Sequence, residues 1–185
     1  VDRLARHLHG DELKVAFAFI LSMPGAPFIY YGDEIGMRYV EGLKSVEGGY
    51  NRTGSRSPMQ WDDSTNAGFS SAPASDLYIA MDPDKDRPTA KKEMAAPDSL
   101  YHEVKKLIRI RQSHKALQSR GKITFVYAEK NTYPLAYIRE DGDEKILVII
   151  NAAAEAKTFA CDAEPKEAIY NFGAAAEAKN GKITV

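Results

Sequence analysis

The adjacent carboxylates Asp33 and Glu34 are the first candidates for acid–base chemistry in this chain. A pair of carboxyl groups can break a bond when one acts as nucleophile and the other as acid and base across that bond. Neighbouring residues of a regular strand point to opposite faces, so this pair cannot flank one substrate bond unless a turn relaxes the geometry. We therefore expect both residues to shape a site, with direct catalysis left open as the alternative.

Side chains that could bind a metal are poorly spaced. His7 and His9 lie two residues apart, and the sequence offers no third ligand near them. The alternating Asp82, Asp84 and Asp86 resemble a calcium loop only faintly, because the glycine and the later glutamate of that motif are missing. We expect a solvated acidic loop, no metal site and no cofactor.

The composition is that of a globular chain with a neutral or small partner. Among 185 residues, 25 basic and 26 acidic side chains give a formal charge of −1, so no global field attracts nucleic acid or anionic lipid. No apolar run reaches the roughly 18 residues needed to span a bilayer. The single cysteine, Cys161, cannot form an internal disulfide. We expect no nucleic-acid or membrane partner, and the location, cytoplasmic or secreted, stays open.

A helix followed by a strand is predicted near the N-terminus. The sequence Gly10-Asp11-Glu12 supplies a cap and favourable charge, and residues 13–21 are apolar nearly all round, which indicates a largely buried helix. Pro24-Gly25 ends it. The apolar and aromatic residues 27–31 are typical of a strand buried on both faces. A helix and a strand at this spacing predict parallel α/β structure.

A long aperiodic loop separates this part from a second helix. Residues 38–97 exceed the usual length of a connection, and loops of that length are functional or disordered. Aromatic residues such as Trp61 and Phe69 argue against disorder. We therefore expect an ordered loop packed over a site, followed by a helix over residues 99–118 that ends near Gly121.

The remainder of the chain predicts a small antiparallel all-β domain. Residues 122–128, 133–139 and 145–151 have the alternation of strands, and weaker candidates follow at 157–161, 167–171 and 182–185. The hexapeptide Ala-Ala-Ala-Glu-Ala-Lys occurs at 152–157 and again at 174–179. Its composition suits a helix, but six residues are too few to hold one. We expect both copies to connect strands.

Two segments carry a resemblance to a known family. Residues 23–37, Met-Pro-Gly-Ala-Pro-Phe-Ile-Tyr-Tyr-Gly-Asp-Glu-Ile-Gly-Met, resemble the region of the eighth barrel strand in the α-amylase family of glycoside hydrolases. Residues 56–62 and 67–70 resemble the loop after that strand in oligo-1,6-glucosidases and trehalose synthases. The resemblance implies an α/β plus all-β chain: residues 1–121 as the last part of a (β/α)8 barrel, and residues 122–185 as an antiparallel β-sandwich lacking its last strand.

The resemblance also implies an enzyme that cleaves or rearranges α-glucosidic bonds in an α-glucan or a small α-glucoside. Retaining hydrolysis needs two carboxyl groups about 5 to 5.5 Å apart across the bond. The family carries its nucleophilic aspartate and its acid/base glutamate on earlier barrel strands, which this chain does not contain. We therefore expect a fragment, cut at both ends, that has no catalytic residue of its own and is inactive.

The resemblance further implies which residues bind or frame the substrate. In the family an arginine commonly follows the aspartate of an Asn-His-Asp motif, which makes Arg3 a candidate substrate-binding residue. Arg56 lies in the loop at the catalytic mouth and could bind sugar hydroxyls or pair with an acidic neighbour. Trp61 and Phe69 could stack on a pyranose, although packing of the loop is favoured. The residues expected to shape the site are Gly32, Asp33, Glu34, Trp61 and Phe69.

Two other functions stay open. The chain could belong to a non-catalytic relative that serves as an interaction or transport-associated domain, which the absence of the catalytic acids from the upstream sequence would favour. Alternatively, the β-rich tail could bind glucan as a module. A partial barrel also leaves apolar surface uncovered, so we expect self-association through that surface.

Overall fold

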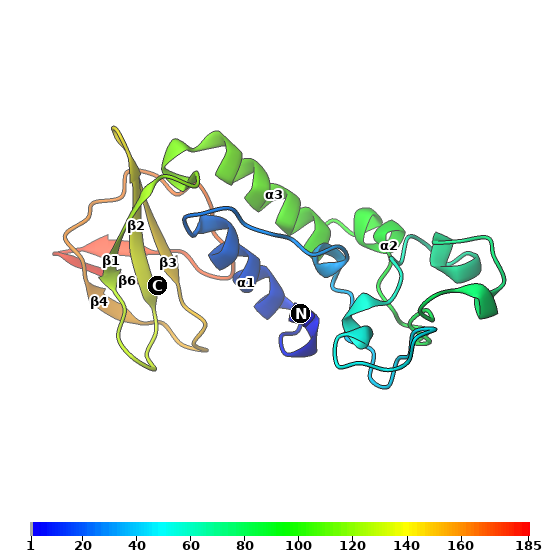
Figure 1. The fold of residues 1–185 in the computed structure, drawn as a ribbon. Coiled ribbons are helices and arrows are strands. Elements are labelled where there is room, and N and C mark those ends of the chain that lie inside the picture. The colour runs from blue at the N-terminus through cyan, green and yellow to red at the C-terminus, as the bar shows by residue number, and fades with distance from the viewer. Residues whose placement is uncertain (1) are drawn as a thin grey trace. The chain divides into compact units, whose positions relative to one another are not determined.

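The computed structural model describes residues 2–185, which form two compact units. The first unit contains the residues up to 14 and residues 28–105, and the second contains residues 15–27 and 106–185. The chain passes between the units three times. Two of the passages lie inside the helices α1 (Asp11–Ser22) and α3 (Leu100–Ser113), both labelled in Figure 1, and the third lies between residues 27 and 28. A division into a barrel part and a sandwich part after residue 121 remains a prediction.

The predicted helix near the N-terminus is confirmed as α1, but its predicted burial on most sides is wrong, because only Leu13, Phe17 and Leu21 are buried. It begins at Asp11, and Glu12 accepts a hydrogen bond at 2.8 Å from the backbone N–H of His9, just before the helix. This bond gives a partner to a backbone donor just outside the helix and holds the Glu12 side chain against the start of α1. The helix ends at Ser22, before Pro24, and Gly25 adopts φ +89°, which an L side chain rarely adopts.

The predicted strand over residues 27–31 is wrong. The backbone there is irregular, and the side chain of Phe28 is 93% exposed. A strand exists only when its N–H and C=O groups pair with a neighbouring strand. Within residues 2–185, every strand lies after residue 121, so the first unit offers no partner for this segment.

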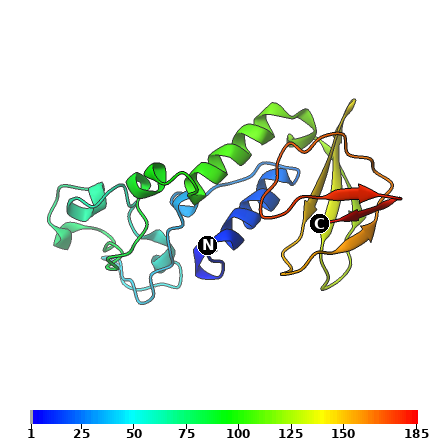
Figure 2. The same cartoon turned by 180° about the vertical axis from the view of Figure 1, so that it is seen from behind.

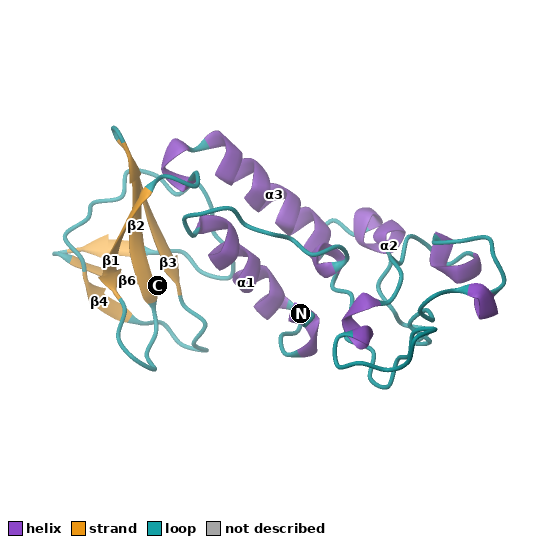
Figure 3. Ribbon diagram, in the orientation of Figure 1, coloured by secondary structure: helices purple, strands orange, loops and turns teal. Residues whose placement is uncertain are grey.

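The long loop of the first unit is built from short turns, which Figure 3 shows as small helical pieces joined by teal connections. Within the loop these are the 3-10 turns Thr53–Arg56, Thr65–Gly68 and Ala74–Asp76, and the turn Asp33–Ile35 lies just before it. The sequence did not predict the helix α2 (Ala90–Ala95), which Thr89 caps by accepting a hydrogen bond at 3.3 Å from Lys92 N–H. A small apolar core holds the unit together: Ile35, Met37, Met59 and Ala90, with Tyr101 packed against it.

The second predicted helix is confirmed as α3, followed by the 3-10 turn Lys115–Leu117. Its last turn carries Arg111, which is buried and donates hydrogen bonds to the carbonyl oxygens of Leu21, Met23 and Gly25 at 2.6 to 2.8 Å. These carbonyls lie at and beyond the C-terminal end of α1, where helix acceptors lack backbone partners. Arg111 therefore replaces the missing donors.

The second unit contains two three-stranded antiparallel sheets. The first has the order β1 (Lys122–Tyr127), β2 (Leu135–Asp141), β3 (Glu144–Ile150). The second has the order β4 (Thr158–Ala160), β6 (Lys182–Thr184), β5 (Glu177–Lys179), seen together in orange to red in Figure 2. Residues of both sheets form one core, Ala136, Phe159 and Ile183, together with Cys161 just after β4.

Two details of this unit correct the predictions. Residues 167–171 form no strand in the structure. The hexapeptide over residues 152–157 is a connection as expected, whereas the copy over residues 174–179 ends in β5. β6 is flanked by β4, which follows the first copy directly, and on its other side by β5, the end of the second copy. Lys157, the last residue of the first copy, exchanges two backbone hydrogen bonds with Val185.

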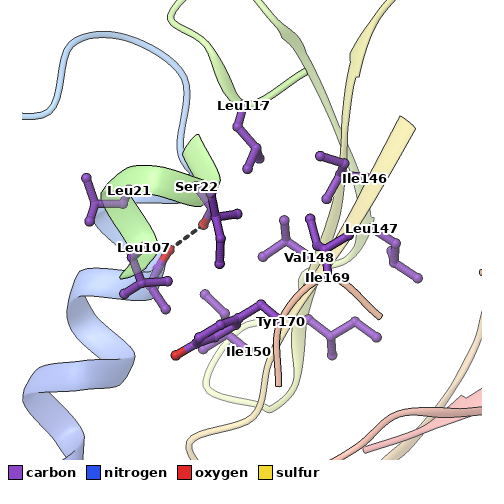
Figure 4. A pocket seen from close by; sticks show the side chains of 13 residues that line it. Leu21, Ser22, Leu107, Leu117, Ile146, Leu147, Val148, Ile150, Ile169 and Tyr170 are labelled. Atoms are coloured by element: carbon purple, nitrogen blue, oxygen red, sulfur yellow. Dashed lines mark hydrogen bonds between the residues drawn. The ribbon is translucent and has the colours of Figure 1, made fainter. Parts of the chain in front are cut away.

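An apolar cavity of about 120 Å³ lies within the second unit. Figure 4 shows Leu107 of α3, Val148 of β3 and Tyr170 among the side chains around it. The residues of β3 from Ile146 to Ile150 line it, and Leu147 and Ile149 also pack against the core formed with Phe159 and Ile183.

Candidate functional site

The Gly-Asp-Glu sequence forms a tight turn in the first unit. Gly32 adopts φ +83°, and a Cβ atom at this position would lie 2.2 Å from the Met37 sulfur. Real Cβ contacts of that length do not occur, so any other residue at this position requires the buried Met37 side chain to move. The 3-10 turn Asp33–Ile35 that follows gives Asp33 and Glu34 different surroundings.

Asp33 is engaged in a buried ion pair with Arg3. The Nη1 atom of Arg3 lies 3.0 Å from Asp33 Oδ1 and also donates to the carbonyl oxygen of Tyr31. The guanidinium stacks at 4.6 Å from the ring centroid of Tyr30 and 4.8 Å from that of Tyr31. Arg3 is 1% exposed and Asp33 is 8% exposed. The pair therefore ties the N-terminal segment to the turn.

Burial raises the pKa of Asp33 above its ordinary value, although the ion pair with Arg3 opposes the change. The nearby charge of Glu34 raises the pKa of Asp33 slightly further. A buried carboxylate held by an arginine is poorly placed to attack a substrate, because the attacking oxygen must be free and close to the reacting atom. This arrangement favours a structural role for Asp33.

A cavity of about 480 Å³ lies beside this turn, wholly within the first unit. Its volume falls in the range of small-molecule sites, about 300 to 1,000 Å³. Aromatic and apolar side chains make most of its wall, together with one carboxylate and one guanidinium. The lining residues are Tyr31, Glu34, Arg56, Pro58, Met59, Trp61, Phe69, Tyr78 and Ile79.

Three aromatic side chains of the cavity are available to a ligand. Trp61 is 51% exposed, Phe69 is 50% exposed and Tyr78 is 54% exposed. Such rings can stack on the C–H face of a sugar ring and remove both apolar faces from water. Packing alone would bury these rings more deeply, so their exposure favours the ligand-binding alternative for Trp61 and Phe69.

The backbone holds Trp61 in place. Its N–H donates to the carbonyl oxygen of Ala67 at 2.8 Å, which closes the loop from Trp61 to Gly68. Gly68 has φ +71°, and a Cβ atom there would lie 2.9 Å from a carboxylate oxygen of Asp62. Asp62 in turn accepts a hydrogen bond at 2.8 Å from Ser64 N–H. The turn is thus fixed by local chemistry and presents Trp61 to the cavity.

Tyr31 forms another part of the wall. Its hydroxyl donates to the carbonyl oxygen of Ser57 at 2.9 Å, and burial, followed by the influence of Tyr30, raises the pKa of Tyr31 to about 12. The phenol therefore stays protonated across the physiological range. This hydrogen bond connects the Gly32 turn with residues 56–61, which supply four of the lining residues.

The structure brings most of the predicted site residues to one cavity. Glu34, Arg56, Trp61 and Phe69 line it, and Gly32 forms the adjoining turn. Arg3 and Asp33 do not line it, because they pair with each other. Sequence reasoning did not single out Tyr31 or Tyr78 as site residues. Tyr31 lies inside the recognised segment 23–37, and Tyr78 lies eight residues after the segment 67–70, so their positions could have indicated them.

The candidate metal ligands are used in other ways. Arg38 forms ion pairs with Asp82 at 3.6 Å and with Asp84 at 2.9 Å, and His7 lies 3.2 Å from a carboxylate oxygen of Asp2. Within the described part of the chain, no group of three or more His, Cys, Asp or Glu side chains could hold a metal ion. None of the helices over residues 2–185 combines the length and apolarity needed to cross a bilayer.

Comparison with known proteins shows which family and which enzymes the chain resembles. The family model described as "Alpha amylase, catalytic domain" matches residues 2–120. A glucan 1,6-alpha-glucosidase of Streptococcus pneumoniae is 31% identical over 195 residues, covering 90% of this chain and 35% of that protein. An oligo-1,6-glucosidase of Parageobacillus thermoglucosidasius is 30% identical over 177 residues, covering 80% of this chain and 31% of that protein.

The chain is also similar to solved structures of the trehalulose synthase MutB. The trehalulose synthase MutB from Pseudomonas mesoacidophila MX-45 has a TM-score of 0.72 at 26% identity, covering 94% of this chain and 36% of that chain. A mutant of MutB in complex with glucose has a TM-score of 0.76 at 26% identity, covering 100% of this chain and 39% of that chain. The chain thus spans about a third of the length of these relatives.

Proposed function

Because the chain belongs to the α-amylase family, we propose that its aromatic cavity binds a glucosyl unit in an enzyme that cleaves or transfers α-glucosidic bonds. The substrate is an α-glucan or a small α-glucoside. The observation that carries this proposal is the combination, in one cavity, of half-exposed Trp61 and Phe69 with the polar side chains of Glu34 and Arg56. Sugars require such a mixture, since they present apolar faces and hydroxyl edges together.

We further propose that the two reacting carboxylates lie outside these 185 residues. The chain spans 35% of the glucan 1,6-alpha-glucosidase, which leaves room for them elsewhere in a protein of that length. Asp33 supports this view, because it is paired with Arg3 rather than free to react. Residues 1–121 then belong to a (β/α)8 barrel and residues 122–185 to a β-sandwich domain. Arg3 as a substrate-binding residue stays a prediction.

Calorimetric titration of the 185-residue chain with maltotriose tests the binding part of the proposal. We expect saturable binding that Trp61→Ala weakens about tenfold or more, because it removes the largest side chain of the cavity wall. Tyr50→Ala is the matched control, since Tyr50 is 53% exposed in the same loop but does not line this cavity. Equal affinities for the two variants would overturn the proposal.

The catalytic part is tested by assaying the same chain with malto-oligosaccharides and an aryl α-glucoside. We expect no turnover, because on this proposal the two carboxylates that must flank the bond lie outside these residues. Turnover that Asp33→Asn abolishes would refute the assignment of Asp33 to a structural role.

A second candidate function is an interaction domain without catalysis. The observation that favours it is a human relative, the amino acid transporter heavy chain SLC3A1, which is 31% identical over 157 residues and covers 80% of this chain. The chain covers 21% of that protein. Sugar binding in the titration above would favour the enzyme, whereas its absence in a chain that is folded would favour the interaction domain.

A further inference from the structure

Glu34 has a feature that the packing of the first unit does not explain. Its carboxylate is part of the cavity wall, and its Oε2 atom is buried without a hydrogen-bond partner in the structure. A buried acceptor left without a donor destabilises the protein, more so when the group is charged. Such an atom, beside a cavity of ligand size, points to a donor supplied by the ligand.

We propose that the Glu34 carboxylate accepts a hydrogen bond from one hydroxyl group of the bound sugar and so selects ligands that carry this hydroxyl. The inference rests on the proposed function, since it requires a sugar in the cavity, and it assigns a direct contact where the sequence predicted only a shaping role. The terminal torsion of a glutamate side chain is broad, so a modest rotation presents either oxygen to the cavity.

The surroundings of Glu34 fit a donor that is neutral. The buried guanidinium of Arg3 forms its ion pair with the preceding carboxylate, Asp33. The positive charge of Arg3 is therefore already paired with Asp33. Arg56, on the same cavity, is exposed to water. A sugar hydroxyl donates to a carboxylate without adding charge, and the aromatic walls reduce competition from water for that bond.

A site that is built to bind a hydroxyl group rejects the analogue that lacks it, because its polar group is then left unpaired. Hydrogen bonds to charged groups are strong enough to change affinity on the order of 10- to 100-fold. Glu34 therefore sets specificity at one position of the sugar ring, whereas Trp61 and Phe69 contribute binding that is the same for all pyranoses.

The test uses the only tryptophan of the chain. Trp61 lines the cavity, so its fluorescence reports occupancy of this site directly. Methyl α-glucopyranoside and its singly deoxygenated analogues are titrated into the 185-residue chain, its Glu34→Gln and Glu34→Met variants, and the control Glu47→Gln. Glu47 is an exposed glutamate of the same long loop that does not line the cavity.

We expect the unmodified chain and Glu47→Gln to bind one deoxygenated analogue about tenfold or more weakly than the parent sugar. Glu34→Gln and Glu34→Met should bind the parent about tenfold more weakly and should lose the discrimination at that position. If both variants discriminate as the unmodified chain does, Glu34 does not contact the sugar and only this inference fails. If the folded, unmodified chain shows no saturable change with any sugar, the proposed function fails as well.

Discussion

At the scale of single residues, both the backbone conformation and the packing at Gly32 disfavour a side chain. A side chain at this position would meet both an unfavourable φ of +83° and the Met37 sulfur at 2.2 Å. We expect Gly32→Ala to lower the free energy of unfolding by about 2 to 4 kcal/mol, because strain and overpacking add. Urea unfolding measures the loss.

The matched control for this prediction is Gly42→Ala. Gly42 has φ +70°, but a Cβ atom added there would meet no other atom within 4 Å, so its substitution adds strain without a clash. We expect a loss of about 1 kcal/mol for the control. Equal losses at the two positions would show that Met37 gives way easily and that the turn is not held by its packing.

The sequence predicted four of the cavity residues, Glu34, Arg56, Trp61 and Phe69, because their motifs are local and specific. It did not predict the ion pair between Asp33 and Arg3, because the two residues lie 30 positions apart and no local pattern joins them. It also left Tyr31 and Tyr78 unassigned. Aromatic residues have the same pattern in sequence whether they pack or bind, and only their exposure in the folded chain distinguishes the two.

At the scale of elements, the carboxylate of Glu144 connects the start of β3 with the turn after α3 in the second unit. Glu144 accepts a hydrogen bond from Ala116 N–H at 2.7 Å and lies 2.6 Å from His114 Nδ1. The bond from Ala116, together with His114, lowers the pKa of Glu144 below its ordinary value of 4.5. A lowered carboxyl pKa stabilises the fold above that value, and the stabilisation is lost as the pH falls through the lowered pKa.

We therefore expect the unmodified chain to lose more stability between pH 6 and pH 3 than Glu144→Gln does, and the difference between the two to shrink as the pH falls. Urea midpoints at successive pH values measure this, and the exposed neighbour substitution Asp143→Asn serves as control. Parallel pH profiles for the unmodified chain and Glu144→Gln would contradict the role of this contact.

Elements with a strong local pattern were predicted from the sequence. The helices α1 and α3 and the strands β1, β2, β3, β4 and β6 lie where periodicity indicates them. The strand over residues 27–31 failed because a strand depends on neighbours that local sequence cannot supply. The short helix α2 was missed because its cap, Thr89, lies in a segment of Pro, Asp and Lys residues without a helical apolar stripe.

At the scale of the whole molecule, the segment without strand partners has a consequence for association. Phe28 is 93% exposed, which is unusual for an aromatic residue of an apolar run. We predict that the chain self-associates through this segment and that Phe28→Ser shifts the sedimentation profile toward the monomer. Val46→Ser, at a side chain that is 76% exposed in the same unit, should leave the profile unchanged. A profile that Phe28→Ser does not alter would exclude this surface.

The hairpin of β5 and β6 has a consequence for how the second sheet assembles. β5 is joined to β6 by only Asn180 and Gly181, both with positive φ, whereas β4 lies more than twenty residues upstream of β6. Closing the shorter loop costs less entropy, so this hairpin forms first and leaves the opposite edge of β6 for β4. The lengths of the two loops therefore set the order in which the two edges of the central strand are filled.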